Sequence, residues 1–502
     1  MEHTQIEKER TQVETSHHSE PVHQHWLSRN RLLAANGAFT VYAIALAVDT
    51  GHADRTWAIW AAVGYGVTTL IIWLTRRMNV PVIWPMLVSL AGALAAPVTW
   101  LVTRVAPTPE VQVISRSAAL LLQHGTPYLL QGQLDNWLSY NPYLPVMAVF
   151  GMPKALGATG LFADPRLWLT AVSIALIWAA FMVAAPHRHC DSCRYNILLS
   201  TVFFAASPVI AFPLAVGITD PPVIALLLLT LALIARPSGL LRAAGALGVA
   251  CAMKATAWPA IPVFAAMLAR RDAARSAWRF VAVTFGVAAV LAAAMAPTAL
   301  AHPYAFLQNT VLFPLGLTQH KTPAASPLPG HLLAMTGMAG HWAAVGLLVA
   351  AGLGFAVSLI VRPPAGPRSA AWRLALGLTV MFTLAPATRW GYFVYPIGLV
   401  AWMFLSRWPS SGAAEEGGPG NGSTTPIGVP AQAGSRALLS GAGLSGADAP
   451  GLPVGQLRGG ERVDRRARGG QYQAGGLGVD VRGDLVHAGR ELVTRIAEHS
   501  AG

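Results

Sequence analysis

A carboxylate stands where an apolar run gives way to an amphipathic stretch. Glu110 follows the apolar run 80–101 and precedes the stretch 111–122, in which apolar residues recur at helical spacing. An acidic side chain is favoured at a helix N-terminus, so Glu110 could simply cap this helix. The chemical alternative is a general base, which would accept the proton of an incoming hydroxyl. Asp135, further along the same polar segment, is the second carboxylate that could do so.

Two charged residues border or interrupt apolar runs in the second half of the chain. Lys254 interrupts the run 241–269, where a cation needs a partner, and an anionic phosphate is a natural one. The lysine could instead extend to the nearest polar boundary. Asp220 follows Gly217 and begins another apolar run, where it could cap a helix. An acid beside cations would suit a substrate that carries phosphate and a hydroxyl to be activated.

Further polar side chains lie in the segments between apolar runs. Some are tyrosines beside prolines, which are often only interfacial anchors, and others are cations in short or Pro-rich connections. The candidate substrate-binding residues are Arg116, Tyr128, Tyr143, Asp220, Lys254, His320, Lys321 and Arg389. The charged residues expected to converge on one side are Glu110, Asp220, Lys254, Lys321 and Arg389.

The composition indicates what must hold these side chains. Of the 502 residues, 54% are hydrophobic and only 11% are charged, whereas soluble proteins usually carry about a quarter charged residues. Apolar runs of roughly twenty residues recur, each long enough to cross a bilayer as a helix. They do not alternate strictly, so a membrane β-barrel is not expected. The net charge of +13 sits mainly in short clusters between the runs, which favours orientation in a membrane over nucleic-acid binding.

The basic clusters predict the topology of the first spans. The runs 32–48, 57–74 and 80–101 are clear, and Arg76 and Arg77 lie between the second and third. The positive-inside rule then places the N-terminal tail, residues 1–31, in the cytoplasm. The next segment, 102–141, is an extracytoplasmic loop too long to be a simple connector. It should carry an amphipathic surface helix, with Val111, Ile114, Ala118, Leu121 and Leu122 on its apolar face.

The middle of the chain leaves the topology open. The run 144–161 is broken by prolines and glycines, and it is either a full crossing or re-entrant. If it is re-entrant, Arg188 and Arg194 are cytoplasmic, which we favour. The run 241–269 is predicted as two short helices or a re-entrant pair. If it is instead one long span, the number of membrane crossings would again agree with the positions of the basic clusters. We expect an all-α, polytopic transmembrane bundle of about eleven to thirteen helices within residues 32–408.

The two ends and the cysteines carry less information. Residues 409–502 are rich in Gly, Ala and Arg and should be disordered, or arise from translation in another frame. Cys190 and Cys193 form a CxxC pair beside His187 and His189, but a zinc site usually needs a second ligand pair nearby. We therefore expect no metal site and no cofactor.

The segment 110–128 resembles the first extracytoplasmic loop of GT-C type glycosyltransferases. It is most similar to glycosyltransferase family 87, the actinobacterial polyprenyl-phosphomannose-dependent mannosyltransferases. The segments 140–145, 217–220 and 245–254 resemble later parts of that family. The family commonly has Asp at the loop position and an aromatic residue four positions on, where this chain has Glu110 and Ile114.

The resemblance implies a GT-C-like fold over roughly residues 32–405 and a specific reaction. A sugar on a polyprenyl phosphate would be transferred, with inversion, to a hydroxyl of a glycolipid, glycan or exported protein at the outer leaflet. Glu110 would be the base and cations would stabilise the leaving phosphate. The protein would then be a multi-pass protein of the cell membrane.

Two other classes of function are weighed against this one. A transporter or flippase for a lipid-linked or small solute would often show repeated halves, and no convincing repeat is present. A non-catalytic membrane scaffold would leave Glu110 and Lys254 without a role.

Overall fold

The computed structural model describes residues 27–49, 52–185 and 191–406. These residues form helices joined by short turns, apart from one isolated parallel bridge between Ala325 and Thr388. The predictions for residues 1–26 and 409–502, and for His187, His189 and Cys190, fall outside the described residues.

Three N-terminal spans form as predicted. They are α2 (Arg29–Asp49), α3 (His52–Leu74) and a third made of α4 (Ile83–Leu90), a π-helical turn (Ala91–Ala95) and α5 (Ala96–Arg104). Gly64 of α3 and Gly92 of the π turn face one another so closely that a Cβ on Gly64 would lie 2.7 Å from the Gly92 Cα. Small residues allow such close backbone approach between membrane helices, and here they set the packing of the second span on the third.

The described residues contain six helices that are long and apolar enough to cross a membrane. A seventh candidate is the pair α9 (Asp191–Ala206) and α10 (Pro208–Val216), which is bent by 56° where Pro208 begins the second helix. The six are α2, α3, the α4–α5 span, α8 (Pro165–Ala184), α14 (Ala274–Met295) and α17 (Met338–Val361). The prediction of an all-α polytopic bundle is confirmed, and the protein is a membrane protein.

The segment 145–155 is not a crossing. It forms a 3-10 helix, Pro145–Gly151, and one turn of α-helix, α7 (Met152–Ala155). Gly151 rests on the loop helix α6 (Pro109–His124), since a Cβ there would lie 2.5 Å from the Ile114 carbonyl oxygen. The segment therefore enters and leaves at one end of the bundle, as the re-entrant alternative requires.

Short helices fill the centre of the bundle. The run 241–269 is two helices, because the backbone of Lys254 is extended between them. The nearly fully buried α11 precedes this pair, and two more helices follow α17. Their bounds are α11 (Asp220–Ile234), α12 (Leu240–Met253), α13 (Ala260–Arg271), α18 (Pro367–Leu384) and α19 (Val394–Leu405).

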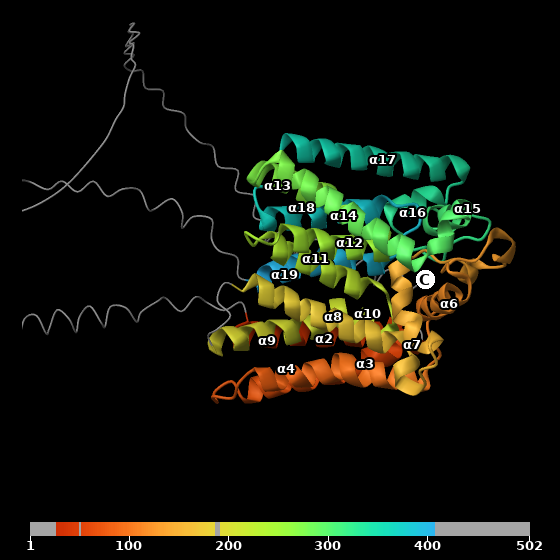
Figure 1. Cartoon of the computed structure of the whole chain (residues 1–502). Coiled ribbons are helices and arrows are strands. Elements are labelled where there is room, and N and C mark those ends of the chain that lie inside the picture. Colours follow the sequence, from red (N-terminus) through yellow and green to blue (C-terminus); the bar gives the residue numbers. More distant parts are fainter. Residues whose placement is uncertain (1–26, 50–51, 186–190, 407–502) are drawn as a thin grey trace, which may run out of the picture. The chain divides into compact units, whose positions relative to one another are not determined.

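The two ends of the bundle differ in charge. Arginines join the connections at one end, where Arg236 donates to the Val183 carbonyl and Arg271 to the Ile234 carbonyl. Nearby, Arg270 donates to the Pro363 carbonyl. The other end carries α6, α7, α15 (Pro303–Leu307) and α16 (Pro329–Ala334) (Figure 1). The positive-inside rule predicts that the arginine-rich end is cytoplasmic.

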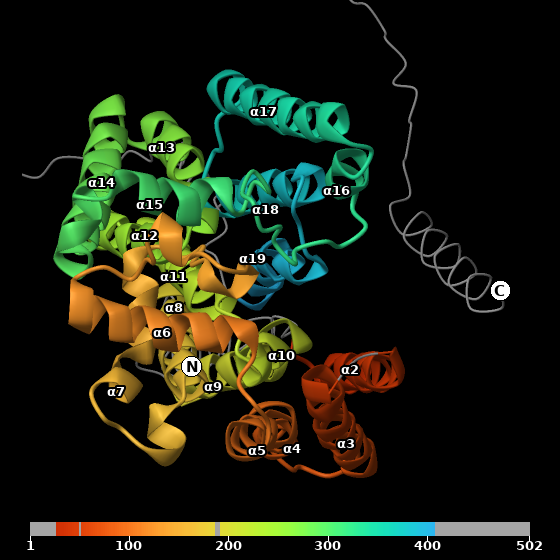
Figure 2. The ribbon, with the colours of Figure 1, turned by 90° about the vertical axis from the view of Figure 1, so that its right-hand side faces the viewer.

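Helix α6 lies across those ends of the central helices that are opposite the arginine-rich end (Figure 2). Four of the five residues predicted for its apolar face are buried: Val111, Ile114, Ala118 and Leu121. Leu122 is the exception, with 51% of its surface exposed. Helix α6 thus packs on protein as well as marking the membrane surface, and its first turn is held over the bundle.

Candidate active site

The start of α6 is fixed to the end of α10. The Thr108 hydroxyl, just before α6, donates to the Val216 carbonyl at 3.1 Å. Pro109 occupies the first helical turn, where its missing N–H costs no hydrogen bond. At the other end Gly125 adopts a left-handed conformation with φ of 67° and ends the helix. Glu110 is thereby aimed at the loop between α10 and α11.

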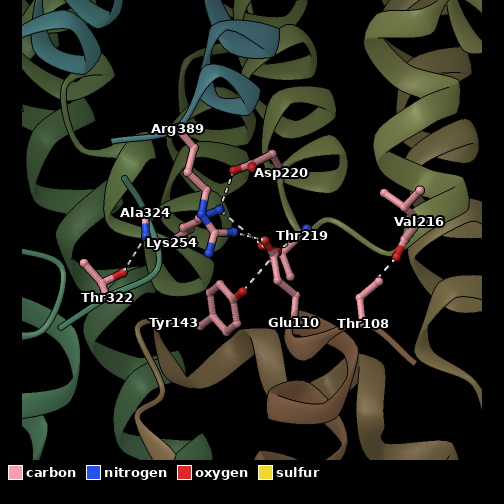
Figure 3. Close-up of polar contacts among 10 residues, drawn as sticks. All are labelled: Thr108, Glu110, Tyr143, Val216, Thr219, Asp220, Lys254, Thr322, Ala324 and Arg389. Carbon is pink, nitrogen blue, oxygen red and sulfur yellow. Dashed lines mark hydrogen bonds and ion pairs between the residues drawn. The ribbon is translucent and has the colours of Figure 1, made fainter. Parts of the chain in front are cut away.

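Glu110 sits at the centre of a polar cluster (Figure 3). Its Oε1 accepts from Arg389 Nη1 at 3.1 Å. Its Oε2 accepts from the Tyr143 hydroxyl at 3.0 Å and from both the backbone N–H and the hydroxyl of Thr219 at 3.2 Å. The side chain of Glu110 is 19% exposed and that of Arg389 is 38% exposed, so this ion pair is open to ligands.

A second ion pair lies deeper in the same cluster. Lys254 pairs with Asp220, and their side chains are only 10% and 2% exposed. The ammonium also donates to the Thr219 hydroxyl at 3.1 Å. It lies 5.5 Å from the ring centre of Tyr143 and 5.6 Å from that of Tyr392, where both rings stabilise a cation. Lys254 therefore has protein partners, and Asp220 neutralises it.

Tyr143 is held in the position from which it donates to Glu110. The Tyr128 hydroxyl donates to the Tyr143 carbonyl, and the Asn141 side chain accepts from its N–H. Burial, followed by the negative charge of Glu110, holds the pKa of Tyr143 well above its ordinary value. The phenol therefore stays protonated and remains a donor to the carboxylate.

Arg389 is held by a strap formed by residues 322–328. The Thr388 N–H donates to the Ala324 carbonyl, and the Ser326 N–H donates to the Thr388 carbonyl. On the other side of Arg389, the Trp390 N–H donates to the Ser326 hydroxyl at 3.1 Å. The backbone is thus fixed on both sides of the arginine while its guanidinium stays half-exposed.

The model of glycosyltransferase family 87 matches residues 141–386. This match confirms the predicted resemblance to glycosyltransferase family 87. The matched part includes Tyr143, Asp220 and Lys254, while Glu110 and Arg389 lie outside it. No curated protein and no solved structure matches the chain.

The family match indicates that the protein is a membrane glycosyltransferase and favours the enzyme over the transporter and scaffold alternatives. Five of the predicted site residues meet in the cluster: Glu110, Tyr143, Asp220, Lys254 and Arg389. The site was predicted to contain Lys321 as well, but that residue is exposed and has no hydrogen bond or ion pair to the cluster within the described part of the chain.

Other predicted site residues of the glycosyltransferase lie away from the cluster, and two of them hold the loop 102–141 in place. Arg116 donates to the carbonyls of Leu138, Ser139 and Tyr140, while burial lowers its pKa from the ordinary value. His320 packs edge-on against Tyr140, with ring centres 6.3 Å apart. Asp135 is exposed, and among the described residues it contacts none of the cluster through a hydrogen bond or ion pair.

Thr219 and Tyr392 belong to the cluster of the glycosyltransferase, and neither was among the predicted site residues. Thr219 stands next to Asp220, and Tyr392 lies three residues after Arg389. Their nearness to predicted charges was the only sequence signal. A threonine before a helix and a tyrosine at a membrane boundary are common for purely structural reasons.

Proposed function

We propose that this glycosyltransferase moves a sugar, mannose on the family resemblance, from a polyprenyl-phosphate donor to a hydroxyl of a glycolipid or cell-envelope glycan. The reaction would take place at the outer face of the cell membrane. The observation that carries the proposal is the partly exposed ion pair of Glu110 and Arg389, which lies at the end of the bundle opposite the arginine-rich end.

The chemistry requires a base and an anion site side by side. Glu110 would remove the proton from the acceptor hydroxyl while its oxygen attacks the anomeric carbon of the sugar. The bond from that carbon to the phosphate oxygen breaks, and the polyprenyl phosphate leaves with the bonding electrons. A cation within reach of that oxygen stabilises the charge that develops on it.

Arg389 suits the leaving phosphate better than Lys254 does. Its guanidinium is 38% exposed and can form two parallel hydrogen bonds to phosphate oxygens. Lys254 is already neutralised by Asp220 and only 10% exposed. We therefore assign the phosphate to Arg389 and leave Lys254 as a buried positive charge close behind it.

The surface beside the site suits a lipid chain. An apolar groove of about 760 Å³ runs between α18 and α19, from Ser369 near the cytoplasmic end to Phe393. Phe393 follows Tyr392, whose ring faces Lys254. A polyprenyl chain in this groove would reach the polar cluster with its phosphate end, which supports a donor that stays in the membrane.

Glu110→Gln tests the proposal directly. The amide keeps the size of the side chain but cannot take up a proton, so sugar transfer should fall by about 10²- to 10⁴-fold. The measurement is transfer of labelled sugar from synthetic polyprenyl-phosphate mannose to membrane acceptors, using purified protein in liposomes. Size-exclusion profiles of variant and wild type establish equal folding.

Asp135→Asn is the competing variant in the same assay. Full activity of Glu110→Gln combined with loss in Asp135→Asn would reassign the base to Asp135. Retained activity in both variants would remove a loop carboxylate from the mechanism.

A further inference from the structure

The two oxygens of the Glu110 carboxylate have unequal surroundings. Oε2 accepts three hydrogen bonds, one from Tyr143 and two from Thr219. Oε1 accepts one, from the half-exposed Arg389. A carboxylate oxygen offers about two lone-pair positions. Oε2 is therefore saturated by protein donors, and Oε1 is the oxygen with capacity left for a substrate.

Thr219 contributes two of the three donors to Oε2, and its own position is fixed. The residue is fully buried and stands immediately before α11. The Lys254 ammonium donates to the Thr219 hydroxyl at 3.1 Å, which occupies that oxygen as an acceptor. The hydroxyl proton is directed to Oε2 of Glu110, at 3.2 Å. The buried Lys254–Asp220 pair thus determines the orientation of the Thr219 hydroxyl.

We propose that Thr219 is a positioning residue, which holds Oε2 of Glu110 and so presents Oε1 to the acceptor hydroxyl. The inference rests on the proposed function, because it requires Glu110 to be the base. The acceptor proton goes to Oε1, beside the Arg389 guanidinium that would hold the leaving phosphate. Acceptor and leaving group are thereby kept on the same open edge of one carboxylate.

The groups that contact Glu110 come from several elements. Arg389 approaches it from the segment before α19, Tyr143 from the segment before the 3-10 helix at 145–151, and Thr219 from the α10–α11 loop. The Lys254–Asp220 pair stands behind Thr219. The hydroxyls of Thr219 and Tyr143 can each be removed by a near-isosteric substitution that leaves every charge in place, and the Thr219 hydroxyl is the one tested here.

Thr219→Val keeps the branched shape and the backbone N–H but removes the hydroxyl. We expect kcat to fall by about 10- to 100-fold, the effect of one hydrogen bond to a charged group, with the donor KM changed by less than about twofold. The acidic limb of the pH–rate profile should move to higher pH by about one unit, because the charged carboxylate loses a donor. Thr219→Ser restores the hydroxyl and should return both quantities to near the wild-type values.

Thr256→Val is the matched control. The Thr256 hydroxyl is hydrogen-bonded to Tyr395 at 2.7 Å and has no contact with Glu110. This substitution removes the same group from a nearby, partly buried position, so the acidic limb should stay where it is in the wild type. Steady-state sugar transfer between about pH 5 and pH 9, in the liposome assay described above, gives all of these quantities.

The outcomes separate this inference from the function on which it rests. An unmoved acidic limb in Thr219→Val, or no recovery in Thr219→Ser, overturns the positioning role of Thr219. If Glu110→Gln is inactive in the same assay, Glu110 still stands as the base. Full activity in Glu110→Gln overturns the base itself. A shift of the same size in Thr256→Val would also contradict the positioning role, because the change would not be specific to Glu110.

Discussion

Asp220→Asn should strongly destabilise the fold, because it leaves Lys254 charged and buried without its counter-ion. The two side chains are 2% and 10% exposed, so water cannot replace the lost carboxylate. Removing one partner of a buried pair typically costs about 3–5 kcal/mol. Asp220 also begins α11, where a negative charge at the helix N-terminus contributes about 0.3–1 kcal/mol more.

Two contacts remain in this variant and reduce the loss. The ammonium still faces the rings of Tyr143 and Tyr392 at 5.5 and 5.6 Å, and such contacts stabilise a desolvated cation by up to about 2 kcal/mol. The net destabilisation should therefore be about 3 kcal/mol. Stability of the variant should also rise with pH, because an unpaired buried amine is tolerated better once it has lost its proton.

The assay is equilibrium unfolding of the purified protein in mixed detergent micelles. The decisive control is the double variant Asp220→Asn/Lys254→Met, which removes both charges and should recover most of the lost stability. A single variant as stable as the wild type would refute the reasoning. So would a double variant no more stable than the single one, since the loss would then not come from an unpaired charge.

Two further predictions concern Arg389 and Gly217. Arg389→Met should lower sugar transfer by at least about tenfold, and Arg389→Lys should recover only part of it, because lysine cannot make two parallel hydrogen bonds to phosphate. Transfer rates measured over a range of donor concentrations check this prediction. Full activity of Arg389→Met would contradict the assignment of the phosphate to Arg389. Gly217→Ala should destabilise the protein by about 1–3 kcal/mol, because Gly217 has φ of 89° and a Cβ there would lie 2.4 Å from Val111 Cγ2. The same unfolding assay measures this loss, and unchanged stability would show that the loop can shift away from α6.

The sequence predicted the charges of the site better than their partners. Glu110, Asp220 and Arg389 meet because each lies beside the end of an apolar helix, and these helix ends lie at the same end of the bundle. The prediction for Lys254 was a charge with an anionic partner, and phosphate was the suggested anion. The structure provides Asp220 instead, which sequence periodicity does not indicate, because the two residues are joined only by the packing of α11 on α12.

Loop residues were the least predictable part. Lys321 and Asp135 carry charges that the proposed chemistry could use, and both lie in loops between helices. Both side chains are exposed, and because neither residue borders a long helix, no helix fixes where its side chain points. Arg389 differs because the strap 322–328 holds the backbone on both sides of it. The run 144–161 is apolar enough for a span, yet prolines and glycines turn its first part into short helices lying on α6.

The charge balance of the cluster bears on how the enzyme would select its substrate. Glu110 and Asp220 oppose Lys254 and Arg389, so the site carries no net charge before a donor binds. In the proposed reaction, the phosphate of the donor would compete with Glu110 for Arg389, the more exposed of the two cations. Loss of that pairing would free Oε1 of Glu110 to accept from the acceptor hydroxyl at the moment when a leaving group is in place. Lys254 cannot follow the phosphate, because Asp220 and Thr219 hold it, and it keeps the cluster assembled while the outer ion pair opens. On this argument one arginine links donor binding to base activation, which is why the Arg389 variants should affect turnover as well as donor binding.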